Sequence, residues 1–181
     1  MKKLFALALT FALVAAIAAG CGKSAPAAKG TVKTGLAVVT SIANSADATA
    51  ADAGVAQGYS TIAAVTVDGS GKIVSCVIDA AQTNVNFGAN GAITTALDSA
   101  FQTKNELGAA YGMKTASSIG KEWNEQAAAF AAYVVGKTAE EVKGIAVDAG
   151  LAADADLVAS VTIHVTDFIE VVSKAVANAS E

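Results

Sequence analysis

Few residues of this sequence could do chemistry, and the clearest candidate is the thiol of Cys21. Two lysines, Lys2 and Lys3, precede an almost wholly apolar run over residues 4–19. Positive charges hold the start of such a run on the cytoplasmic side while the apolar part enters the membrane. The run is shorter than the ~20 residues that span a bilayer, which disfavours a lasting transmembrane helix. The pattern therefore predicts a signal segment over residues 1–20 that places Cys21 outside the cytoplasm.

The residues directly before this cysteine, Ile17-Ala18-Ala19-Gly20, resemble the lipobox of bacterial lipoproteins. In that family the cysteine sulfur receives a diacylglyceryl group, and the chain is cut just before it. The resemblance implies lipidation of Cys21 and a protein anchored by lipid to a membrane of the cell envelope, on its extracytoplasmic face. The alternative is an ordinary secretory signal that a cysteine follows by chance.

The charged residues exclude nucleic acid as a partner. The chain has 12 Lys+Arg against 16 Asp+Glu, and every basic residue is a lysine. Removal of Lys2 and Lys3 with the signal segment leaves 10 against 16, a net charge of 10 − 16 = −6. Nucleic-acid binding needs a basic surface, usually one rich in arginine.

The other residues that could take part in catalysis or metal binding, one histidine and one further cysteine, argue against an enzyme and against a metal site. His164 is the only histidine, and histidine-based triads and metal centres need further partners or ligands. With Cys21 lipidated, Cys76 has no partner for an intramolecular disulfide. Because Cys76 lies in an apolar strand-like run, we expect it to be a buried small hydrophobe and not a reactive thiol.

The segment that follows the signal is predicted to be a flexible tether. Residues 21–34 hold mainly alanine, glycine, lysine and serine, with the only proline of the chain at Pro26. Such composition is typical of flexible linkers. The folded domain is therefore expected over residues 35–181.

Strands are expected in the first half of this domain. Residues 61–67 and 72–78 are apolar runs that flank the glycine-rich turn 68–71, which predicts an antiparallel hairpin. Residues 35–42 form another β-branched, apolar run, and a polar loop follows over residues 44–54. On the strand 72–78, Val74, Cys76 and Ile78 are expected to share the buried face.

Helices dominate the second half. Trp123, Ala127, Phe130 and Val134 recur at helical spacing and predict a core-facing stripe, with Glu122, Glu125 and Gln126 on the opposite side. A capping box starting at Thr138 predicts a short helix to about Gly144. Alternation over 158–165 predicts a strand, with Val161, Ile163 and Val165 on one face. A second capping box, Asp167 to Glu170, predicts a last helix to about Ala177.

Together these strands and helices predict an α+β fold: one domain with a small antiparallel sheet and helices packed on one face.

The hairpin and the C-terminal segment resemble FMN-binding domains of bacterial membrane-linked and surface flavoproteins. The resemblance rests on Gly58-Tyr59, the hairpin strands, and the spacing from Asp156 to Thr162, which matches the family motif D-x-x-S/T-G-A-T/S. In that family the last hydroxyl of the motif is joined to FMN by a phosphoester. The resemblance thus implies FMN as cofactor, with Thr162, Ser160 and Asp156 among the residues that bind it and the hydroxyls of Ser160 and Thr162 near its phosphate. Tyr111 is expected to offer an aromatic surface to the flavin ring.

The interior of the motif departs from the family pattern and leaves two hypotheses open. Ala159, Ser160 and Val161 stand where the family has a hydroxyl residue, a glycine and an alanine. Serine resists backbone conformations that glycine adopts, and valine fills space that alanine leaves free. The first hypothesis is a lipid-anchored FMN-binding-like domain, either an electron carrier with an envelope redox partner or a binder of a small ligand. The alternative is a cofactor-free surface lipoprotein that binds a protein or another envelope component.

Overall fold

The computed structural model describes residues 30–180, and the following statements refer to that part of the chain. The predicted signal segment, Cys21 and most of the predicted tether lie outside it. No helix within residues 30–180 is both long enough and apolar enough to cross a bilayer.

Three antiparallel strands form the main sheet, as predicted. They are β1 (Lys33–Ser41), β2 (Gly54–Val67) and β3 (Ile73–Phe87), in the order β1-β2-β3, so that β2 is central. With the helices packed on this sheet, the α+β fold is confirmed. β1 begins at Lys33, two residues before the expected start of the domain.

The predicted hairpin turn joins β2 to β3. The Asp68 carboxylate accepts hydrogen bonds from the backbone N–H groups of Ser70 (2.9 Å) and Lys72 (3.0 Å). Gly71 has a φ of +79°, a conformation that glycine adopts without strain. The Ser70 hydroxyl also donates to this carboxylate (2.7 Å), and this bond, followed by the two backbone bonds, lowers the pKa of Asp68.

The prediction of which β3 side chains face the core is wrong at the start of the strand, because the β2–β3 pairing contains a bulge. Thr66 pairs with Ser75 whereas Val67 pairs with Ile73, so Val74 is the extra residue. Ile73 consequently occupies the core, and Val74 is half exposed. Ile78 is buried as expected. Cys76 packs at the margin of the core, and this burial raises the pKa of its thiol to about 12, which keeps the thiol protonated at neutral pH.

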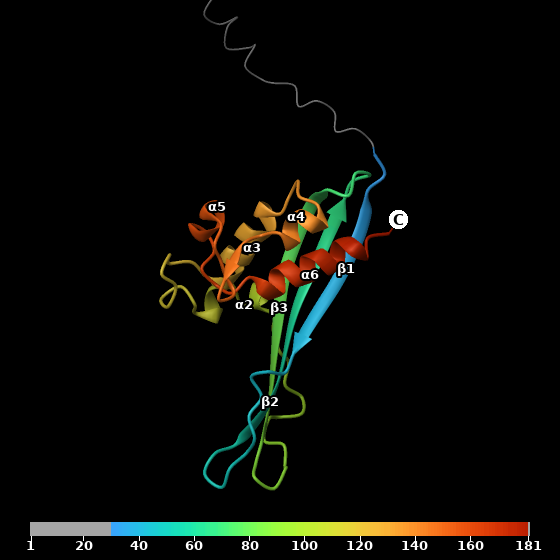
Figure 1. Ribbon diagram of the computed structural model, residues 1–181. Coiled ribbons are helices and arrows are strands. Elements are labelled where there is room, and N and C mark those ends of the chain that lie inside the picture. The colour runs from blue at the N-terminus through green and yellow to red at the C-terminus, as the bar shows by residue number, and fades with distance from the viewer. Residues whose placement is uncertain (1–29, 181) are drawn as a thin grey trace, which may run out of the picture. The chain divides into compact units, whose positions relative to one another are not determined.

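Both strands of the hairpin are about twice as long as the sequence predicts. Their outer parts, residues 54–60 of β2 and 79–87 of β3, contain polar side chains that hide the strand pattern, yet the backbone pairing runs from Gly54–Phe87 inward. In Figure 1 these parts continue beyond the helices as a two-stranded arm.

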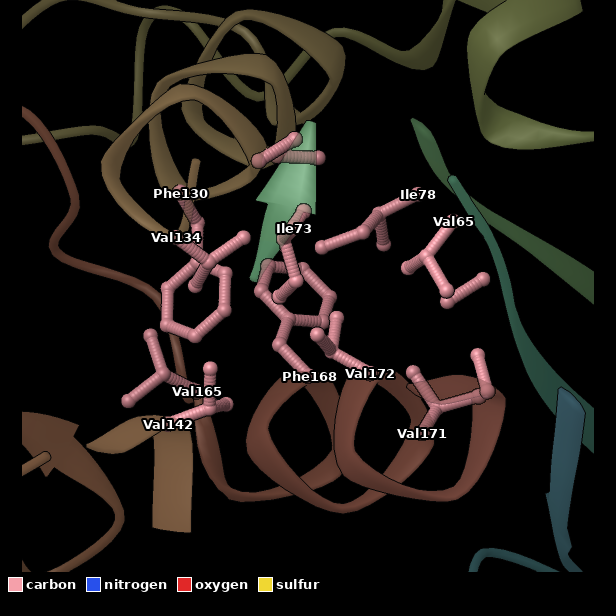
Figure 2. Packing of buried hydrophobic residues seen from close by; sticks show 14 of the residues in the cluster. Val65, Ile73, Ile78, Phe130, Val134, Val142, Val165, Phe168, Val171 and Val172 are labelled. Atoms are coloured by element: carbon pink, nitrogen blue, oxygen red, sulfur yellow. The ribbon is translucent and has the colours of Figure 1, made fainter. Parts of the chain in front are cut away.

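Two helices cover one face of the sheet (Figure 1). Helix α6 (Thr166–Ala177) packs on β1 and β2, helix α3 (Trp123–Tyr133) packs on β3, and the short α4 (Ala139–Lys143) packs on α6. Figure 2 shows the core between them, where Phe130 of α3 and Phe168 of α6 meet. Their rings lie 5.4 Å apart in an edge-to-face arrangement, and Trp123 contacts the Phe168 ring in the same way at 5.7 Å.

Short elements connect these layers. α2 (Lys104–Leu107) and the 3₁₀ turn η1 (Gly108–Tyr111) follow the arm, while β4 (Val147–Asp148), β5 (Leu151–Ala152) and α5 (Ala155–Val158) precede α6. The capping box predicted at Thr138 is present: its N–H donates to Glu141 (2.7 Å), whose own N–H donates to the Thr138 hydroxyl (3.3 Å).

The strand predicted over residues 158–165 is not formed. Residues 155–158 are helix α5, and Leu157, Val161 and Val165 are buried at intervals of four residues instead of two. The alternation of apolar and polar residues in this segment concealed that spacing. The predicted capping box at Asp167 is also wrong, because α6 begins at Thr166 with Val165 at its cap and no side-chain bond there. The end of α6 at Ala177 is confirmed.

Close contact between β1 and α6 depends on Gly35. A Cβ atom at this position would overlap the backbone carbonyl oxygen of Ala175, which cannot rotate away. We therefore expect Gly35→Ala to lower the free energy of unfolding by about 2 kcal/mol, as overpacking does in other cores. Urea unfolding followed by circular dichroism measures this change.

Gly58→Ala is the matched control, because Gly58 also lies in a strand, and a Cβ there meets no atom within 4 Å. This variant should be as stable as the unmodified protein or slightly more stable. Equal unfolding midpoints for the two variants would contradict the close approach of α6 to β1.

Candidate functional site

Three of the residues predicted to bind FMN, Asp156, Ser160 and Thr162, lie in α5 and in the segment directly after it. Asp156 is exposed in the first turn of this helix. The Ser160 hydroxyl donates to the Leu157 carbonyl oxygen (3.2 Å). The backbone N–H and the hydroxyl of Thr162 both donate to Gln126 Oε1, at 2.8 and 3.2 Å. Both hydroxyls of the motif are thus engaged by acceptors of the protein itself.

Gln126 was expected on the solvent side of α3, and this expectation is wrong. The residue is 0 % exposed. In addition to holding Thr162, its amide nitrogen donates to Ser117 Oγ and to the Lys121 carbonyl oxygen, both at 3.2 Å. A buried amide with all its polar atoms paired is a structural crosslink between α3 and the segment before α6.

Tyr111 lies in a different hollow from Thr162. Thr162 lines a hollow of about 240 Å³ beside Met113 and Gln126. Tyr111 lines a cavity of about 410 Å³ that shares none of those residues. One flavin site would require Tyr111 and Thr162 to lie together, and the structure does not bring them together. We call the larger cavity the Lys104 pocket, and it is lined by Ser41, Asn44, Gln57, Tyr59, Thr61, Gln82, Lys104, Tyr111, Trp123, His164, Asp167 and Phe168.

A buried positive charge is the main feature of this pocket. Lys104 is only 6 % exposed. Its ammonium nitrogen lies 4.7, 4.6 and 5.0 Å from the ring centroids of Tyr59, Tyr111 and Trp123. It also donates a hydrogen bond to the Tyr59 hydroxyl (3.0 Å). An ammonium group over aromatic faces is attracted by their negative charge density, by about 2 kcal/mol where water is excluded.

Helix α2 fixes Lys104 through contacts with β3. Thr103 caps the helix: its N–H donates to Glu106 (2.7 Å) and its hydroxyl accepts from the Glu106 N–H (3.3 Å). The next residue, Asn105, donates from its side chain to the Ile78 carbonyl oxygen (2.9 Å) and from its backbone to the Asp79 carboxylate (3.1 Å). Thr103 also pairs with Ala81 of β3 in an isolated antiparallel bridge, so Lys104 lies between two residues that are bonded to the sheet.

Strand β2 supplies the floor of the pocket. Gln57, Tyr59 and Thr61 alternate along it and therefore point to one face. Thr61 is 1 % exposed, and its hydroxyl oxygen has no hydrogen-bond partner among residues 30–180. A buried polar group without a partner costs roughly 1–3 kcal/mol. Thr61 itself is one of the residues that line the pocket.

Amide side chains form a polar row beside this floor. Gln57 accepts a hydrogen bond from the Asn44 side chain (3.0 Å) and donates one to Asn84 (2.9 Å), its neighbour on β3. Gln82 lies opposite Tyr59 in the β2–β3 pairing. Amides that both donate and accept hydrogen bonds are suited to hydroxyl, amide and carboxylate groups of a small molecule.

The segment before α6 and the start of that helix complete the pocket with His164, Asp167 and Phe168. The pocket thus contains one lysine, one carboxylate and one imidazole, yet no carboxylate of residues 30–180 makes a salt bridge with Lys104. The salt bridges of this part of the chain, Lys143–Glu140 and Lys174–Glu170, lie on the surface. No cluster of three or more potential metal ligands occurs among the described residues.

Most of the pocket was missed in the sequence, which pointed to Tyr111 as a site residue and favoured a core position for the other aromatic candidate, Trp123. A usable signal was present in β2. Its inward positions change from Ala63, Val65 and Val67 to Gln57, Tyr59 and Thr61, and such a change marks the point where a core face becomes a binding face. Lys104 left no comparable signal, because an isolated lysine is usually exposed.

Comparisons with protein-family models, with curated proteins and with solved structures found no match for this chain. The functional argument therefore rests on the geometry of the Lys104 pocket and on the sequence patterns.

The crosslink through Gln126 yields a stability prediction. Gln126→Leu leaves the Thr162 N–H and hydroxyl without their acceptor, and we expect a loss of about 2–4 kcal/mol in the free energy of unfolding. Thr162→Val keeps the backbone bond and should cost about 1 kcal/mol. Urea denaturation of both variants measures the difference, and a larger loss for Thr162→Val would contradict this assignment.

Proposed function

We propose that the protein is a lipid-anchored, extracytoplasmic binding module that takes a small polar ligand into the Lys104 pocket. One observation carries the proposal: a buried ammonium group and a buried hydroxyl without a partner line the same cavity. It develops the ligand-binding form of the first hypothesis from the sequence.

The composition of the pocket supports ligand binding. Small-molecule sites commonly measure 300–1,000 Å³ and combine apolar walls with a few placed polar groups. At about 410 Å³, with the rings of Tyr59, Tyr111 and Trp123 and the Gln57 amide among its lining groups, the pocket has this character.

A purely structural role accounts less well for Lys104. Burial of an ammonium group without a carboxylate partner costs several kcal/mol, and contacts with aromatic rings offset only part of this cost. An apolar side chain such as methionine would fill the space between the rings without that penalty. The charge becomes useful once a ligand completes its hydrogen bonds.

The expected lipid on Cys21 would confine this module to a membrane surface. Residues 21–34 would link the anchor to β1, so the pocket would meet ligands outside the cytoplasm. In the electron-carrier form of the proposal FMN is bound as well. That form relies on the spacing from Asp156 to Thr162, whose hydroxyls make the internal bonds described above.

Binding can be tested with the single tryptophan of the chain, Trp123, because it lines the pocket. Purified full-length protein is titrated with a panel of neutral sugars, amino acids, monocarboxylates, nucleosides, phosphate esters and FMN, by fluorescence and calorimetry. We expect at least one class to bind, and Thr61→Val and Gln57→Leu each to weaken that binding by about tenfold, the equivalent of one lost hydrogen bond.

Thr66→Val is the matched control, because Thr66 lies on β2 but is not part of the pocket lining. It should bind as the unmodified protein does. Absence of binding by every class at millimolar concentration, or equal affinity of all three variants, would refute the proposed pocket.

Lipidation and flavinylation can be tested together by intact-mass measurement of protein isolated from bacterial membranes. We expect loss of residues 1–20 and added acyl mass at Cys21, since stable anchoring requires two or more acyl chains. Cys21→Ser should remain uncut and without acyl mass. Added FMN mass that disappears in Thr162→Val would support the electron-carrier form. A full-length, unmodified product in the cytosol would refute the anchor.

A further inference from the structure

We infer that the ligand of the Lys104 pocket carries one carboxylate group, which pairs with the Lys104 ammonium. This inference rests on the proposed function and specifies the chemical class of the ligand.

The hydrogen bonds of Lys104 indicate a missing acceptor. An ammonium group has three N–H donors, and in residues 30–180 the only hydrogen bond of this group is to the Tyr59 hydroxyl. The rings of Tyr111 and Trp123 attract the charge but do not replace an oxygen acceptor. A carboxylate provides two oxygens, and charge-assisted bonds to it are roughly twice as strong as neutral ones.

Thr61 provides a second, independent sign of a missing group. Its hydroxyl oxygen is buried without a partner, and the residue lines the pocket from β2, the strand that also carries Tyr59. Because a hydroxyl can turn to donate or accept, it can bond either to a carboxylate oxygen or to a neighbouring polar group of the same ligand. Two unfilled bonding positions in one cavity are satisfied together by a small oxygen-rich molecule.

The charges of the pocket limit the ligand to a single negative charge. Among residues 30–180, Lys104 is the only lysine that lines it, and Asp167 lines it together with its neighbours His164 and Phe168. A second anionic group in this cavity would meet Asp167 and find no second lysine. Monocarboxylates should therefore bind better than dicarboxylates or phosphate monoesters, which carry about two charges at neutral pH.

Two matched series test this inference on the full-length protein. The first comprises benzoate, its neutral amide benzamide, phthalate and phenyl phosphate, and the second comprises lactate, lactamide and malate. Affinities are measured by Trp123 fluorescence and calorimetry. In the unmodified protein we expect the monocarboxylate of at least one series to bind tenfold or more tightly than its amide, and more tightly than the dianions.

Variants then assign the effect to residues. Lys104→Met should reduce the carboxylate-to-amide ratio to about one, because the amide loses little when the charge is removed. Lys137→Met is the matched control, since Lys137 also lies over an aromatic ring, that of Tyr133 at 4.3 Å, but outside the pocket. It should keep the ratio. Asp167→Asn should improve binding of phthalate or malate several-fold more than binding of the monocarboxylate.

The outcomes separate this inference from the function on which it rests. If the amide binds as tightly as the carboxylate, or the dianions bind best, the inference is wrong while the ligand-binding function stands. The same holds if only neutral members of the wider panel bind. If no compound of the panel or of either series binds, the proposed function fails too. The ratio in the unmodified protein does not depend on the folding of any variant.

Discussion

The alternation of side chains along β2 is the constraint on which both the core and the pocket depend. Val67, Val65 and Ala63 point into the core, and on the same face Thr61 and Tyr59 line the Lys104 pocket. A shift of one residue would turn all of these positions to the other face. The bulge at Val74 confines the irregularity of the hairpin to β3, next to the turn. The pairing of β2 therefore stays regular from the core to the arm.

Under the proposed function, the protein gives up stability at the pocket in return for a binding position that is already ordered. The ammonium of Lys104 is already desolvated, held by α2 and oriented by the Tyr59 hydroxyl, so a ligand need not order it on binding. The cost falls on the unbound protein, which buries a charge and the Thr61 hydroxyl without full compensation. Such local losses are typical of functional sites, because binding groups must remain unsatisfied until the ligand arrives.

The sequence predicted those parts of the fold whose signals are local. The hairpin turn at Asp68, the stripe of helix α3 and the cap at Thr138 follow from short-range patterns, and all three are confirmed. The outer half of the hairpin was missed because its side chains are polar, although its backbone is paired. The prediction of a strand over residues 158–165 was wrong. The conformation of this segment depends on a hydrogen bond to a distant residue, Gln126, which no local pattern reveals. The pocket is lined by residues that are scattered along the chain between Ser41 and Phe168. Because no local pattern connects them, only Tyr111 was assigned to a site from the sequence.

Thr162 has a clear structural role that connects the two hollows. Gln126 binds its N–H and hydroxyl, while Trp123, one turn earlier on α3, lines the Lys104 pocket. His164, two residues after Thr162, lines the same pocket. Helix α3 thus lines the pocket with Trp123 and also fixes the segment that contributes His164. The hydroxyl that the family resemblance assigns to a flavin thus bonds to the helix that lines the Lys104 pocket. The proposed function requires such a second layer of bonds, because the walls of a binding site must be held in place.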